Sequence, residues 1–196
     1  DSAVLWAKHY RMDSFRFDLM GHQPRAAMER LQSAVNMATG RDVQLIGEGW
    51  NFGEVENGAR FVQASQLSLN GSGIGTFSDR ARDAARGGSA GDSGEAVIKQ
   101  QGYINGLVYD ANALAGARPR ADLLQAADTI RVGLAGTVRS YPLANADGVT
   151  RKLEDMKYGG QPAGYASAPG ETVNYVENHD NQTLYDANAL KLPLAT

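Results

Sequence analysis

The sequence contains no cysteine, which excludes disulfide bonds, thiolate catalysis and cysteine-based zinc sites together. It has only 3 histidines, so we predict no metal site built on histidine ligands. No apolar run approaches the roughly 18 residues that span a bilayer, and we expect no membrane partner. Basic residues form no block and the net charge is −3, so we expect no nucleic-acid partner. The 196 residues otherwise have the composition of a globular domain, 42% hydrophobic and 21% charged.

Apolar periodicity and turn signals predict alternating helices and strands, the pattern of a parallel sheet covered by helices. Pro24 is expected at the first position of a helix that Gly40 ends. The segment 64–69 fits either a strand or a loop. The expected elements are helices over 1–10, 24–40 and 121–136, strands over 15–18, 43–48 and 172–176, a strand end running into a helix over 75–88, and loops over 87–106 and most of 140–171.

The stretch SFRFDLMGH, residues 14–22, combines a hydrophobic strand pattern with two charges. Side chains alternate along a strand, so Arg16 and Asp18 are expected on one face and Phe15 and Phe17 on the other. The neighbouring guanidinium favours the ionised form of the carboxylate. By itself the pattern fits a structural ion pair as well as a carboxylate that is held anionic as a nucleophile.

Three of the predicted strands finish at an acid, namely Asp18, Glu48 and Asp180. In β/α barrels, functional side chains lie at the carboxyl ends of several strands. Thirty residues separate Asp18 from Glu48, and a barrel of roughly 250 residues has about 31 in each β/α unit. We therefore expect an α/β fold that is part of a (β/α)8 TIM barrel.

Three short segments resemble signature regions of the α-amylase superfamily of glycoside hydrolases. They are FRFDLMGH (15–22), LIGEGW (45–50) and ENHDNQTL (177–184). Their variants most resemble pullulanase-type debranching enzymes, and so does GSGIGTFSDRARDAARGG (71–88). The resemblance implies that the chain carries roughly strands four to seven of the catalytic barrel.

The resemblance also implies roles for individual residues. Asp18 would be the nucleophile, Glu48 the general acid/base and Asp180 the acid that holds substrate hydroxyls in the transition state. Arg16 and His179 match the partners of these acids in the family. The implied reaction is hydrolysis of α-1,6-glucosidic branch points with retention of configuration.

Three further residues are candidates for substrate binding. Trp50 could stack on a sugar face or pack in the core. His22, just after the first strand, could line the pocket or serve the turn. Asn181 follows directly after the acid of the third motif.

Other activities have weaker support. The sequence GDSGE (91–95) resembles the nucleophile segment of serine proteases, but no histidine is placed to activate its serine. The sequence GSGIG (71–75) resembles a phosphate-binding loop, but it does not complete the G-x-G-x-x-G pattern. An α-1,4-acting amylase, a transglycosylase and an inactive glucan-binding barrel remain the alternatives within the resemblance. The last is expected to have lost at least one of the three acids, and all three are present.

The expected partners are an α-glucan substrate and the remainder of the catalytic domain. No cofactor is expected to be required, and the sequence does not determine whether calcium binds. The compartment is open, although the resemblance fits an extracellular or periplasmic location. We interpret residues 1–196 as a fragment of a single barrel with a glycine-rich insertion around 87–120, and expect the isolated fragment to be inactive and poorly stable because an open barrel exposes its edge strands.

Overall fold

The computed structural model describes residues 1–193 of the chain, which form two compact units. The first unit comprises Asp1–Phe77 and Tyr165–Val173, and the second comprises Ser78–Gly164 and the chain from Asn174 onward. In the described residues, no helix is long and apolar enough to cross a membrane. Helices and strands alternate between Ser2 and Gly47, and both occur in the rest of the described chain, so the predicted α/β class is confirmed.

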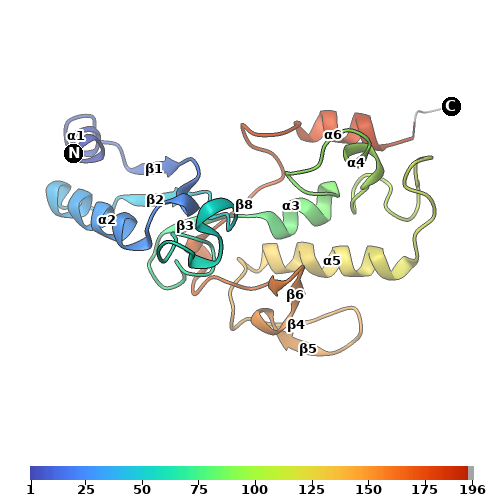
Figure 1. Ribbon diagram of the computed structural model, residues 1–196. Coiled ribbons are helices and arrows are strands. Elements are labelled where there is room, and N and C mark those ends of the chain that lie inside the picture. Colours follow the sequence, from blue (N-terminus) through green and yellow to red (C-terminus); the bar gives the residue numbers. More distant parts are fainter. Residues whose placement is uncertain (194–196) are drawn as a thin grey trace. The chain divides into compact units, whose positions relative to one another are not determined.

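The first unit is built on a four-stranded sheet with the order β1-β2-β3-β8 (Figure 1). β1 pairs with β2 and β2 pairs with β3, both in parallel. β1, β2 and β3 are thus neighbours both in the sheet and along the chain, whereas the strands that lie between β3 and β8 in the sequence form two separate hairpins. The strands are β1 (Ser14–Phe17), β2 (Gln44–Gly47), β3 (Gly75–Ser78) and β8 (Thr172–Asn174); the helices are α1 (Ser2–His9) and α2 (Arg25–Thr39), with short 3-10 turns at Met20–His22, Gly53–Gly58 and Pro169–Glu171.

The core of this unit forms where α2 packs on the strands. Pro24 immediately precedes α2, and Gly40 ends the helix with a φ of 64°, a left-handed conformation that suits glycine. The strand burial follows the predicted alternation, since Phe15 and Phe17 lie on the half-buried face of β1. One cluster of buried side chains contains Met20, Met28, Leu45, Ala64, Leu69 and Ile74, and a second joins Ala7, Val35 and Val43.

The second unit is organised around two helices, α3 (Asp79–Arg86) and α5 (Arg120–Leu134), which lie side by side. Gly133 allows their close approach, because a Cβ there would lie 2.4 Å from the Cβ of Ala81. Buried Val132 packs with Leu143 of one hairpin and with Leu153, which lies between the two hairpins. The remaining elements are the helices α4 (Glu95–Lys99) and α6 (Leu184–Lys191), the 3-10 turn Leu153–Asp155, the hairpin of β4 (Pro142–Ala144) with β5 (Thr150–Lys152), and the hairpin of β6 (Lys157–Tyr158) with β7 (Gln161–Pro162).

The second unit also departs most from the sequence predictions. The expected loop over 87–106 contains α4, and the expected loop over 140–171 contains both hairpins. These elements are only two to five residues long, too short to show a periodic pattern. α6 was not predicted, and the strand expected over 172–176 ends at Asn174. Segment 64–69 contains no strand.

Candidate active site

Two acids follow directly after neighbouring parallel strands. β1 ends at Phe17 and is followed by Asp18, and β2 ends at Gly47 and is followed by Glu48. Phe17 and Gly47 are register partners. The next residue of each strand therefore leaves the same edge of the sheet, and carboxylate oxygens of Asp18 and Glu48 lie within 4.8 Å of each other. The predicted position of both acids at strand ends is confirmed.

Arg16 connects the two carboxylates. Its guanidinium forms an ion pair with Asp18, and its Nη2 lies 2.7 Å from Oε1 of Glu48. The guanidinium also lies over the ring of Phe77, 5.5 Å from the centroid. The two acids differ in environment, because the side chain of Asp18 is 66% exposed and that of Glu48 only 6%. The site therefore contains one accessible and one buried carboxylate, and both pair with the guanidinium of Arg16.

Backbone groups fix the position of Glu48. Its Oε2 accepts a hydrogen bond of 2.8 Å from the backbone N–H of Leu19. Leu19 has a φ of 45°, an uncommon left-handed conformation that turns the chain back over the sheet after Asp18. The Glu48 carbonyl in turn accepts a 2.7 Å bond from the N–H of Gly21. The turn 18–21 thus holds both ends of the buried acid.

Trp50 and His22 lie near this turn in different ways. Trp50 is half-buried, and its backbone oxygen packs against Gly21. The ring of His22 contacts Phe52 edge-on, with centroids 4.7 Å apart. The Nδ1 of His22 is buried and has no hydrogen-bond partner among the described residues. A contact of either residue with a sugar stays a prediction.

The three candidates of the third motif belong to the second unit. His179, Asp180 and Asn181 are exposed on the loop between β8 and α6. The N–H of Asp180 donates to Oδ1 of Asn178 at 3.0 Å, and Nδ2 of Asn181 donates to the carbonyl of Ala90 at 3.1 Å. The structure thus groups Arg16, Asp18 and Glu48 in one unit and these three residues on one loop of the other.

Sequence reasoning missed the structural residues of the site. Leu19 and Gly21 hold Glu48 through backbone N–H groups, which no side-chain pattern reveals. Phe77 had no signal beyond its position in a strand. For Gly21 a signal existed, since a glycine in a tight turn often marks a close backbone approach.

Gly21 gives a direct test of this packing. A Cβ on Gly21 would lie 2.2 Å from the backbone oxygen of Trp50, so Gly21→Ala must displace the chain that follows Glu48. We expect a loss of about 1–3 kcal/mol in stability. The matched control is Gly170→Ala, because a Cβ there meets nothing within 4 Å. Equal thermal unfolding midpoints for the two variants would contradict this packing.

Adjacent carboxylates at the ends of parallel strands, held by one arginine, define a site suited to acid–base and nucleophilic chemistry. No protein-family model matches the chain. Curated relatives do match: pullulanase of Klebsiella pneumoniae is 42% identical over 195 residues, covering 97% of this chain and 17% of the relative. The chloroplastic pullulanase 1 of Arabidopsis thaliana is 41% identical over 205 residues, covering 99% of this chain and 21% of the relative.

Solved structures agree with these relatives. The crystal structure of Klebsiella pneumoniae pullulanase complexed with maltotriose has a TM-score of 0.91 and 40% identity, and the match covers 98% of this chain and 18% of that chain. The resemblance predicted from the motifs is confirmed, and this chain is a homologue of pullulanases. It spans between 17% and 21% of the length of the two curated relatives.

Proposed function

We propose that the protein containing this chain is a retaining glycoside hydrolase that cleaves α-1,6-glucosidic branch linkages in pullulan and related α-glucans. The observation that carries the proposal is the Asp18–Arg16–Glu48 arrangement. Its support is the homology to pullulanases and the short distance between the acids. In retaining enzymes the carboxyl groups are about 5–5.5 Å apart, whereas inverting enzymes need roughly 6.5–9.5 Å to admit a water.

In the first step, an oxygen of Asp18 attacks the anomeric carbon. The bond to the leaving oxygen breaks, and Glu48 gives its proton to that oxygen. Water then attacks the same carbon, Glu48 accepts the proton of that water, and Asp18 leaves as a carboxylate. The exposure of Asp18 suits a nucleophile that a sugar must reach, and the buried backbone bonds of Glu48 suit an acid that must be held still.

Arg16 would balance the charge during this exchange. In the first step Asp18 loses its negative charge as it forms the ester, while Glu48 gains one as it releases its proton. Since the guanidinium contacts both carboxylates, the charge can move from one acid to the other without a new partner. This role requires a rigid group that donates hydrogen bonds to both carboxylates at once, and the planar guanidinium of arginine suits it better than the ammonium of lysine.

The other residues enter the proposal through the resemblance. Asp180 and His179 would hold substrate hydroxyls, with Asn181 beside them. Trp50 and His22 would line the sugar site. The substrate would be an α-glucan oligosaccharide or polysaccharide, and we propose that the four strands of the first unit belong to a (β/α)8 barrel completed by the rest of the catalytic domain.

Hydrolysis of pullulan tests the function. We expect the full-length protein to cut pullulan to maltotriose, with proton NMR showing the α-anomer as the first-formed reducing end. Amylose, which has only α-1,4 linkages, is the matched control substrate. Cleavage of amylose with pullulan left intact would favour the α-1,4-acting alternative. Initial release of the β-anomer would refute retention.

A further inference from the structure

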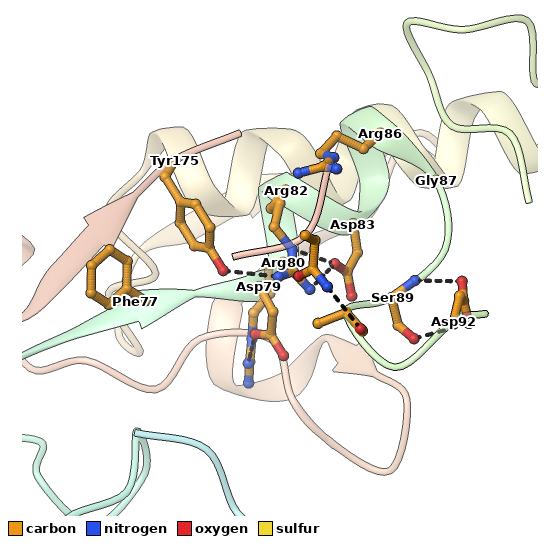
Figure 2. Close-up of polar contacts among 12 residues, drawn as sticks. Phe77, Asp79, Arg80, Arg82, Asp83, Arg86, Gly87, Ser89, Asp92 and Tyr175 are labelled. Atoms are coloured by element: carbon orange, nitrogen blue, oxygen red, sulfur yellow. Dashed lines mark hydrogen bonds and ion pairs between the residues drawn. The ribbon is translucent and has the colours of Figure 1, made fainter. Parts of the chain in front are cut away.

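Helix α3 carries three buried arginines, Arg80, Arg82 and Arg86, whose side chains Figure 2 shows projecting from the helix. Burial of a guanidinium is costly unless its donors are satisfied. The donors of each arginine therefore show which part of the unit it stabilises. Arg86 differs from the other two in what it contacts.

Arg86 binds both ends of the loop that carries His179 and Asp180. Its Nη1 donates to the carbonyl of Val176 at 2.9 Å, and its Nη2 donates to the carbonyl of Gln182 at 2.7 Å. Only the residues 177–181 lie between these two carbonyls. The guanidinium thus joins the two ends of the loop. Because it is planar and rigid, it fixes the distance between the carbonyls of Val176 and Gln182.

Arg86 is itself held in place by its neighbours. Its carbonyl accepts bonds from Nζ of Lys191 at 2.8 Å and from Nδ2 of Asn105 at 2.7 Å. The following Gly87 has a φ of 78°, and a Cβ there would lie 2.2 Å from the carbonyl oxygen of Gln100. The helix end that presents Arg86 therefore cannot move independently of the segment packed against it.

We propose that Arg86 is a positioning residue for Asp180, acting by closing the loop 177–181 at its base. The inference rests on the proposed function, in which Asp180 holds substrate hydroxyls. A displacement of about 1 Å in a positioned group can cost 100-fold in rate. Loss of one of the two carbonyl contacts removes the closure that Arg86 provides, and the loop keeps the bond from Asn181 to the carbonyl of Ala90 and that from the Leu184 N–H to the Glu177 carboxylate.

The test compares Arg86→Lys with Arg80→Lys in the full-length protein. Arg80 is the matched control because it is also buried and also donates to two backbone carbonyls, those of Pro162 and Ala163, at 2.9 and 3.2 Å. Both variants keep the positive charge but replace the planar guanidinium, which donates to two carbonyls, with a single ammonium group. We expect Arg86→Lys to lower kcat on pullulan by about 10–100-fold and Arg80→Lys by less than about threefold.

A double variant identifies the route of the effect. If Arg86 acts through Asp180, then Arg86→Lys should change kcat by less than about twofold in an Asp180→Asn background. The reason is that the effects of two residues that act through the same group are not additive. An undiminished further loss of kcat in that background would overturn the proposal. Equal kcat values for Arg86→Lys and Arg80→Lys would also overturn it.

Hydrogen exchange gives a readout that does not depend on activity. Arg86→Lys should speed exchange of the amides in 177–182, and Arg80→Lys should leave them unchanged. Should the wild-type protein not cleave pullulan, the proposed function fails, while this measurement still decides whether Arg86 orders the loop. Arg86→Gln, a neutral residue with a shorter planar amide, replaces the lysine variant if that variant does not fold.

Discussion

Asp18→Asn is expected to lower kcat on pullulan by about 10⁴-fold or more in the full-length protein, because the amide is a poor nucleophile. The fold should be little affected, since the side chain of Asp18 is 66% exposed and its partner Arg16 keeps the bond to Glu48. Steady-state kinetics measures the loss, and the thermal unfolding midpoint shows whether the variant is folded.

The other end of the same strand supplies the control for this variant. Asp13 comes just before β1, is 85% exposed and forms an ion pair with Arg41. Asp13→Asn removes the same charge from a similar surface pair, which typically contributes about 0–1 kcal/mol. We expect it to retain full activity. If the two variants have similar kcat values, Asp18 is not the nucleophile.

Lys191→Met is expected to have the largest effect on stability. The ammonium of Lys191 is buried and donates to the carbonyls of Arg86, Gly87 and Gln100 at 2.8, 2.6 and 2.9 Å. Methionine fills a similar space but removes this donor from all three carbonyls, of which that of Arg86 keeps the bond from Asn105. Removing the buried donor should cost about 3–5 kcal/mol.

Hydrogen exchange of residues 87–101 measures this effect locally, in the segment that contains the carbonyls of Gly87 and Gln100. The control is Lys99→Met, since Lys99 is exposed at the end of α4. Similar exchange rates in the two variants would show that the three bonds contribute little.

The contribution of Lys191 to the free energy of unfolding depends on pH. Burial, with the neighbouring charge of Arg86, lowers the pKa of Lys191 to about 8 from its ordinary value of 10.5. Between pH 8 and about 10.5 the unfolded chain therefore binds more protons than the folded chain at this group. By linkage, its contribution to the free energy of unfolding rises with pH across that interval and falls as pH drops through 8. Protection of 87–101 in the wild type should thus increase relative to Lys191→Met from pH 8 to 10.

The sequence by itself determined the alternation of helices and strands in the first unit and the placing of two acids at strand ends. Both follow from local rules: period-2 burial placed Phe15 and Phe17 opposite Arg16, and α2 lies between Pro24 and Gly40. The homology to pullulanases was likewise readable, because it rests on short contiguous motifs.

Only the tertiary structure decided which groups these acids contact. The bond between Arg16 and Glu48 joins residues 32 positions apart, and that between Arg86 and Gln182 joins residues 96 apart. The hydrophobic pattern of either strand or helix would be the same without those partners. Bonds from backbone groups, such as that of Leu19 to Glu48, depend on a left-handed turn that leucine rarely adopts in isolation. Such contacts arise from packing between distant segments, so local sequence could indicate the acids but not what holds them.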